Sequence, residues 1–167
     1  MLNALQTPAP IDPAFAPYPY FTQTNLLGSC AVSKASHSPG EPLSARFVLF
    51  HGATLEEWDA YLDCWAPTNH TFASESTEAL FREQARAAME AAPPSAVAIN
   101  FDRSGLGEYG HGHMSPLGAY DAGTDSFLLL DVSRYKYPGV WVPTNMLYAA
   151  MNTTDTTTAR SRGCVVV

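Results

Sequence analysis

The sequence has few basic residues and no cluster of them. Only 9 Lys and Arg stand against 16 Asp and Glu in 167 residues, which gives a net charge of −7. No basic run could follow a phosphate backbone, so the sequence predicts no nucleic-acid partner. It also has no stretch of the roughly 18 apolar residues that a membrane span needs, and its N-terminal region lacks the charged-then-apolar pattern of a signal peptide. We therefore expect a soluble, cytoplasmic protein with no membrane partner.

Cysteine is scarce as well. Cys30, Cys64 and Cys164 are odd in number and widely spaced, which fits neither a disulfide framework nor a zinc-binding pattern of paired cysteines. We expect free thiols in a reducing compartment. A hydrophobic content of 46% over this length suffices for one domain with a true core, so residues 1–167 are predicted to form a single globular domain.

Local patterns divide the N-terminal half into loops and short elements. Residues 7–20 are rich in proline, which excludes helix and central strand and predicts an extended loop. Residues 33–44 are a second predicted loop, and ARFVLFH, residues 45–51, has the composition of a short strand. A helix is predicted to follow, because Thr54 and Glu57 have the spacing of a capping box. Its apolar face comprises Leu55, Trp58, Leu62 and Trp65.

The C-terminal half predicts a helix followed by antiparallel strands. Residues 76–92 are rich in helix-forming residues and end at Pro93 and Pro94, and AVAINF, residues 96–101, alternates like a strand. HMSPLGAY and SFLLLDV flank DAGTD, whose residue types predict a hairpin turn. The chain thus has the element order of an α+β fold, with helices first and an antiparallel sheet after them.

The predicted hairpin brings a histidine and an aspartate together. If Tyr120 pairs with Ser126, then His113 and Asp131 lie on the same face of adjacent strands as diagonal neighbours, within reach of each other. A buried aspartate is costly unless it is paired, and a histidine partner is the one that also performs proton transfer. A purely structural hydrogen bond between these two side chains is the alternative.

Three other patterns suggest chemistry more weakly. His111 and His113 could ligate a metal, but no third ligand is evident, and His111 is better interpreted as a loop residue. Ser115 precedes a proline on a strand and is not set at the strained turn of a serine nucleophile. The last four residues from Cys164 fit a prenylation signal, although three valines also predict an ordinary final strand.

Several segments of the chain resemble the phytochelatin synthase family. GHMSPLGAY, TDSFLLLDVSRYKYPGVWVP, MLYAAMNTTD and RSRG carry the resemblance from about Gly110 to the C-terminus, and GATLEEWDAYLDC, ASESTEALFR and LNAL extend it more loosely to the start. The resemblance implies a papain-like fold and a Cys-His-Asp triad in which His113 is the general base and Asp131 its orienting partner. It also implies that Arg134, Asp155 and Arg162 hold the γ-glutamyl end of the substrate. Lys136 matches too, without an assigned role.

The resemblance implies a reaction and its partners. The family transfers the γ-glutamylcysteinyl group of glutathione to a second glutathione or to water, in the cytoplasm. It responds to divalent heavy-metal ions such as cadmium or zinc, which act through glutathione thiolates and need no fixed protein ligands, so metal detoxification is the expected role.

The chain departs from the family at the nucleophile. MLNAL, residues 1–5, resembles the later part of the helix that the family's nucleophilic cysteine opens, so we expect the chain to begin inside that helix, without the thiol. Cys64, in Cys64-Trp65-Ala66 where the family has C-N-G, is expected in the core, and Cys30 is a weak substitute because it lacks a helix N-terminus. Two hypotheses follow: a transferase that is inactive as this chain alone, or a non-catalytic glutathione-binding module.

Overall fold

The computed structural model describes residues 1–28, 44–93 and 95–167. The chain divides into two compact units, Met1–Thr68 with Val167, and Asn69–Val166. Cys30 lies outside the described residues, and so does the predicted loop at 33–44 except for its last residue. No described helix has the length and apolar character of a membrane span.

The first unit contains short helices: a 3₁₀ turn Pro13–Phe15 within the proline-rich segment, α1 Gln23–Gly28, α2 Ala45–His51 and α3 Leu55–Asp63. The capping box predicted for α3 is present. The Thr54 backbone N–H donates to Oε2 of Glu57 at 2.8 Å, and the Glu57 N–H donates to Oγ1 of Thr54 at 3.2 Å. This reciprocal pairing satisfies two backbone donors at the start of α3 and confirms the predicted helix.

The strand predicted at residues 45–51 is wrong, because this segment is helix α2. Ser44 caps the helix by accepting a hydrogen bond from the Phe47 N–H at 3.1 Å, and Gly52 ends it at a φ of 73°. Phe47 is buried in a small cluster with Tyr61. The capping residues on both sides of the segment therefore outweigh its aromatic and β-branched composition.

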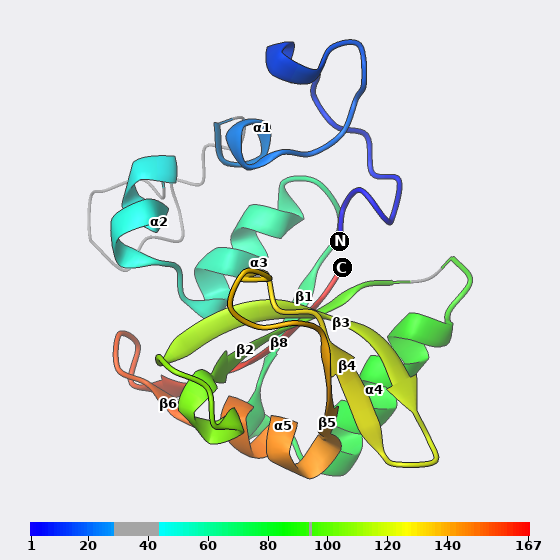
Figure 1. Ribbon diagram of the computed structural model, residues 1–167, viewed down its shortest axis with the longest axis vertical. Helices are drawn as coiled ribbons and strands as arrows, with labels where there is room; N and C mark the ends of the chain where they lie inside the picture. Colours follow the sequence, from blue (N-terminus) through cyan, green and yellow to red (C-terminus); the bar gives the residue numbers. More distant parts are fainter. Residues whose placement is uncertain (29–43, 94) are drawn as a thin grey trace. The chain divides into compact units, whose positions relative to one another are not determined.

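The second unit is built on a six-stranded antiparallel sheet in the order β1-β8-β2-β3-β4-β5. Helices α4 Glu78–Glu90 and α5 Thr144–Met151 pack their apolar residues against one face of this sheet (Figure 1). A separate two-stranded ribbon pairs β6 with β7. The strands are β1 Asn69–Phe72, β2 Val97–Asp102, β3 Gly112–Asp121, β4 Ser126–Leu129, β5 Val140–Pro143, β6 Thr154–Asp155, β7 Arg160–Ser161 and β8 Gly163–Val166.

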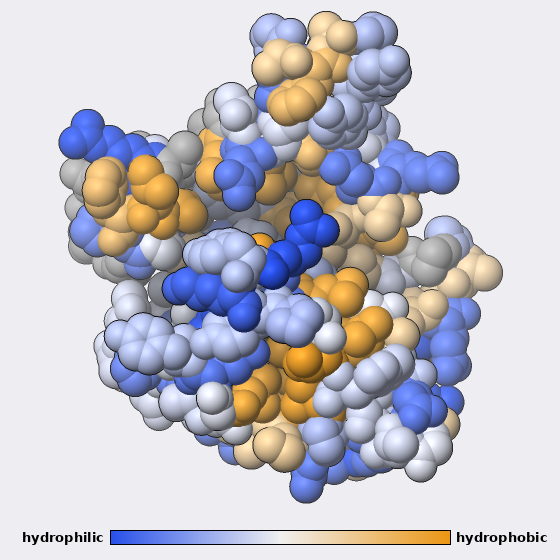
Figure 2. Space-filling view, viewed as in Figure 1, coloured by the Kyte–Doolittle hydropathy of each residue, from blue (hydrophilic) through white to orange (hydrophobic). Residues whose placement is uncertain are grey.

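The unit confirms the predicted α+β class. The second predicted helix corresponds to α4 and the AVAINF strand to β2. The strand predicted for the final valines corresponds to β8, which pairs with β2. Outside this core, apolar side chains remain exposed near β4 and β5, where Figure 2 shows an apolar patch. They include Leu130, Val140 and Trp141.

The β3–β4 hairpin has a different register at its tip from the one predicted. Tyr120 pairs with Phe127 and Asp121 with Ser126, whereas Leu117 pairs with Leu129. The register shifts at Gly118, where a β-bulge adds one residue to β3. A Cβ at Gly118 would lie 2.8 Å from the Leu130 side chain, which would have to shift to admit it. Beyond the bulge the register is the predicted one.

Asp125 ties the hairpin turn to both helices. Its carboxylate accepts hydrogen bonds from Nε and Nη2 of Arg82 on α4, at 2.7 and 2.8 Å, from the Tyr120 hydroxyl at 2.9 Å and from the Thr144 hydroxyl at 2.8 Å. The Arg82 hydrogen bond is the main reason why the pKa of Asp125 is lowered to about 2. This carboxylate therefore fixes the hairpin tip to α4 and α5.

Candidate functional site

The structure brings His113 and Asp131 together. His113 follows the first residue of β3, and Asp131 lies two residues beyond the end of β4. Nε2 of His113 is 3.1 Å from Oδ1 of Asp131. The imidazole side chain is 19% exposed and the carboxylate 2%. The predicted contact is therefore observed, although Asp131 sits in the segment after the strand rather than within it.

The Asp131 carboxylate is surrounded by donors. The Ser133 N–H donates to Oδ1 at 2.6 Å, and Nη2 of Arg103 lies 3.0 Å from Oδ1 and 2.8 Å from Oδ2. Arg103 is itself buried, and its Nη1 lies 3.3 Å from the Glu108 carboxylate. The buried negative charge of Asp131 is thus balanced by a buried guanidinium, as a carboxylate in such a place requires.

The environment disfavours the protonated form of the His113 imidazole. Burial is the largest cause that lowers its pKa, and the Arg103 charge lowers it further, against the opposing effect of Asp131. A carboxylate only accepts hydrogen bonds, so Nε2 of a neutral ring must carry the proton that it shares with Asp131. Within the part of the chain that the structure describes, Nδ1 makes no hydrogen bond, and its lone pair is available to take a proton. This is the arrangement of a general base with an orienting carboxylate.

Arg162 and Asp155 form a second pair. Nη1 of Arg162 lies 3.4 Å from Oδ2 of Asp155 and donates to Oδ1 of Asn100 at 3.5 Å. Arg162 is buried, and its Nε has no hydrogen-bond partner among the described residues. Both contacts of Nη1 are long for a buried cation, so this guanidinium retains capacity for an anion.

Arg162 also lies against the start of β3. A Cβ atom at Gly112 would lie 2.6 Å from Nη1 of Arg162 and 3.0 Å from its Cζ, so the guanidinium packs against the backbone of the residue before His113. The absence of a side chain at Gly112 makes this approach possible.

Arg134 is not part of either pair. It is exposed in the turn after Asp131, and within residues 1–28, 44–93 and 95–167 it makes no ion pair or hydrogen bond with the other candidate residues. Its assignment to the substrate remains a prediction. Lys136 is exposed in the same turn.

The weaker alternatives have unsuitable surroundings. His111 is 87% exposed and lies 3.7 Å from Asp102, and no three His, Cys, Asp or Glu in the described ranges are grouped to hold a metal ion. The Ser115 hydroxyl is buried in β3. These positions fit the interpretations of His111 as a loop residue and of Ser115 as a strand residue.

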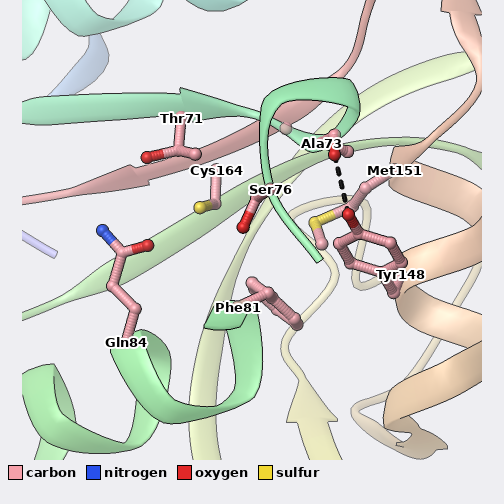
Figure 3. Close-up of a pocket in the computed structure, with 9 residues that line it drawn as sticks. Thr71, Ala73, Ser76, Phe81, Gln84, Tyr148, Met151 and Cys164 are labelled. Atoms are coloured by element: carbon pink, nitrogen blue, oxygen red, sulfur yellow. Dashed lines mark hydrogen bonds between the residues drawn. The ribbon is translucent and has the colours of Figure 1, made fainter. Parts of the chain in front are cut away.

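The described cysteines differ from expectation. Cys64 is disulfide-bonded and exposed at the C-terminal end of α3, so it is neither a free thiol nor a core residue. Spacing along the chain does not report which sulfur atoms meet in space, and this cysteine lies beyond the buried face of its helix. Cys164 is free and buried in β8, where it lines a small cavity with Thr71, Ser76 and Gln84 (Figure 3). Burial raises the pKa of its thiol to about 11.

The sequence analysis missed Arg103, Glu108 and Asn100. Arg103 follows strand β2 directly, and its neighbour Phe101 pairs with His113 across the sheet. A charged residue at the end of a buried strand, next to a strand that begins with the candidate base, was a usable signal. Asn100, a buried amide within an apolar strand, was a second one.

Comparison with known proteins identifies the family of the chain. A family model described as phytochelatin synthase matches residues 1–164. Glutathione gamma-glutamylcysteinyltransferase 3 of Lotus japonicus is 49% identical over 69 residues, which is 41% of this chain and 14% of the relative. Enzymes with related names from Triticum aestivum and Schizosaccharomyces pombe are 48% and 39% identical over 68 and 71 residues. This chain matches only 14% and 17% of the length of those two relatives. The match of the family model over nearly all of its length shows that the chain belongs to the phytochelatin synthase family.

Proposed function

We propose that this chain carries the base and the γ-glutamyl subsite of a glutathione γ-glutamylcysteinyltransferase. The observation that supports this most directly is the 3.1 Å contact between Nε2 of His113 and the buried Asp131. The family and the names of the relatives supply the substrate class. The proposal also includes a papain-like arrangement of the catalytic groups.

The proposed reaction has two steps. A cysteine thiolate attacks the carbonyl carbon of the Cys–Gly amide of glutathione, the C–N bond breaks, and protonated His113 gives its proton to the leaving amine of glycine. The product is a γ-glutamylcysteinyl thioester. His113 then takes a proton from the amine of a second glutathione, or from water, as this nucleophile attacks the thioester and the thiolate leaves. Asp131 holds the ring with Nδ1 toward the reacting atoms throughout.

The γ-glutamyl end of the substrate is assigned to the second pair. Arg162 can bind the α-carboxylate of the substrate, and Asp155 can bind the α-amino group. The unpartnered Nε of the buried Arg162 supports this assignment, because it is a donor that the described residues leave unused. Arg134 is proposed to assist from the rim, since its side chain is exposed.

The nucleophile is assigned to a cysteine outside the described residues. Cys164 is buried with a raised pKa, and Cys64 is disulfide-bonded, so neither supplies a reactive thiolate. A cysteine on a segment joined ahead of Leu2, as the family resemblance implies, could supply it. We propose that the isolated 167-residue chain is inactive.

Metal ions enter the proposal as part of the substrate. Cadmium or zinc would be bound by glutathione thiolates and would activate transfer in that form, which gives the protein a role in heavy-metal detoxification. We propose a cytoplasmic location, where glutathione chemistry of this kind is expected. The disulfide at Cys64 is unusual for that compartment, and a thiol count under reducing conditions would test it.

A non-catalytic glutathione-binding module is the second candidate. It is favoured by one observation, that neither described cysteine is suited to attack. Such a module would bind glutathione through Arg162 and Asp155 without releasing glycine. The buried network around His113 favours the enzyme, since binding alone does not require an oriented base.

The deciding experiment restores a thiol. The family's nucleophile segment is joined ahead of Leu2, and glycine release from glutathione is measured with and without cadmium. We expect turnover that disappears when the added cysteine is changed to serine, and that falls by about 10³-fold or more in His113→Ala. Arg86→Gln, which removes an exposed charge from α4, is the matched control and should keep full activity. Binding of glutathione with no turnover would favour the module.

A further inference from the structure

We propose that Arg103 is a positioning residue for the His113–Asp131 pair. It fixes the carboxylate so that Asp131 accepts the Nε2–H of His113 and the other ring nitrogen stays available. The importance of this for catalysis rests on the proposed function, but the structural claim does not.

The Arg103 side chain is enclosed by its neighbours. Its guanidinium contacts Asp131 on one side and Glu108 on another, and its Cζ lies 4.8 Å from the centre of the Tyr137 ring. The Tyr137 hydroxyl in turn accepts a hydrogen bond from the Tyr109 N–H at 2.8 Å. A Cβ at Gly110 would lie 3.4 Å from Cδ of Arg103, so the stem of the side chain is also enclosed. A guanidinium held on all these sides has one orientation.

The backbone of Arg103 is held as firmly as its side chain. It begins the 3₁₀ turn Arg103–Leu106, which Asp102 caps by accepting the Ser104 N–H at 2.9 Å. The Arg103 N–H donates to the carbonyl of His111, and its own carbonyl accepts from Glu108 at 3.0 Å. Gly107 closes the turn at a φ of 75°, a conformation that favours glycine. The turn therefore presents Arg103 to Asp131 from a rigid base.

Arg103 and the Ser133 N–H together fix the orientation of the Asp131 carboxylate. Its Nη2 contacts both carboxylate oxygens, and the Ser133 N–H binds Oδ1, the oxygen that also faces Nε2 of His113. Without the guanidinium, Oδ2 would be a buried anionic atom with no contact from a cation, and the carboxylate could rotate to find one. Rotation would release the imidazole from its single orientation.

Arg103 also balances the charge that His113 experiences. Among the described residues, the charged groups that act on the imidazole are Asp131 and Arg103, with Glu108 behind Arg103. The Phe101 ring of β2 lies against the imidazole, with 5.8 Å between the ring centres. Burial is the largest cause that lowers the pKa of the ring, whereas Asp131 raises it by favouring the protonated form. The guanidinium offsets this effect, so that the ring is oriented by a carboxylate and is still free to exchange its proton.

The test uses the 167-residue chain and needs no turnover. With ¹⁵N-labelled histidine, NMR distinguishes the protonated from the unprotonated ring nitrogen and follows each ring through a pH titration. In the wild type, neutral His113 should carry its proton on Nε2. In Arg103→Gln the two tautomers should mix and the pKa of His113 should rise, because the nearby cation is lost. Arg86→Gln removes an exposed charge and should change neither property.

Arg103→Lys separates charge from geometry. It retains the cation but loses the planar fork, so the pKa should stay near that of the wild type while the Nε2–H preference weakens. If Arg103→Gln does not fold, Arg103→Lys decides by the same two readouts. A wild-type ring protonated on Nδ1, or a folded Arg103→Gln or Arg103→Lys protein with unchanged tautomer preference, overturns the proposal. Absence of glycine release in the restored protein would count against the proposed function and leave this result standing.

Discussion

Gly112→Ala tests the contact between Arg162 and the start of β3. The added Cβ would lie 2.6 Å from Nη1 of Arg162, whereas ordinary contacts begin at 3.4 Å, so the guanidinium must move by roughly 0.8 Å. The φ of Gly112 is not in the left-handed region, so the backbone accepts alanine without strain. The perturbation therefore acts on the position of Arg162 alone.

The cost follows from the contacts that Nη1 already has. Its distances to Asp155 and Asn100, 3.4 and 3.5 Å, are at the long end of the range, and a shift of this size breaks one or both of them. Loss of hydrogen bonds to a buried charged group costs about 1 to 3 kcal/mol. We expect the free energy of unfolding to fall by about 1 kcal/mol, and the affinity for S-methylglutathione to fall about 10-fold or more.

Two measurements check this prediction, thermal unfolding and titration calorimetry with S-methylglutathione. Gly123→Ala is the control, because a Cβ there meets Asp121 at an ordinary 3.5 Å. If the loss acts through Arg162, Gly112→Ala should have little further effect on binding in an Arg162→Ala background. Wild-type binding by Gly112→Ala would refute the inferred subsite. An undiminished loss in the double variant would show that the alanine acts elsewhere.

Three further predictions concern the site, the hairpin tip and the thiol. In the restored protein, Arg162→Ala should lower kcat/KM for glutathione, by an amount that corresponds to a loss of about 2 to 4 kcal/mol of transition-state stabilisation. The variant should also lose the preference for glutathione over a peptide that lacks the γ-glutamyl α-carboxylate. A wild-type protein that cleaves both equally well contradicts the assignment. Asp125→Asn should destabilise the fold by about 1 kcal/mol near neutral pH, since this carboxylate is partly exposed. Because the folded state lowers the pKa of Asp125 from 3.8 to about 2, its contribution is present above 3.8 and is lost as the pH falls toward 2, so the difference in Tm by circular dichroism should shrink in that window. The unmodified chain should release no glycine from glutathione; release that Cys30→Ser abolishes would make Cys30 the nucleophile.

Much of the second unit could be predicted from sequence because its signals are local. The capping residue and helix formers of α4, the alternation of β2 and the turn residues between β3 and β4 each act within a few neighbours. The meeting of His113 with Asp131 followed from strand register alone. The prediction of a single domain stays a prediction. The structure shows two compact units, Met1–Thr68 with Val167 and Asn69–Val166.

The rest depended on contacts between distant segments. Helix α2 differs from the predicted strand because its capping residues Ser44 and Gly52 outweigh the aromatic and β-branched composition of the segment. The register at the hairpin tip depends on a bulge that forms where Gly118 meets Leu130, a contact that spacing does not reveal. Arg103 reaches Asp131 across a large separation in sequence, and the disulfide state of Cys64 is likewise a matter of three-dimensional proximity.

The bulge at Gly118 insulates the candidate site from changes at the hairpin tip. A regular hairpin can slide by whole residues, and each single step would turn every side chain of one strand to the opposite face. Here the two halves of the hairpin have different registers, so sliding would require the extra residue to migrate along β3 past the Leu130 side chain. Insertions or substitutions in the turn can therefore accumulate without altering the alignment of His113 with Asp131. The hairpin tolerates sequence drift at one end while it preserves chemical geometry at the other.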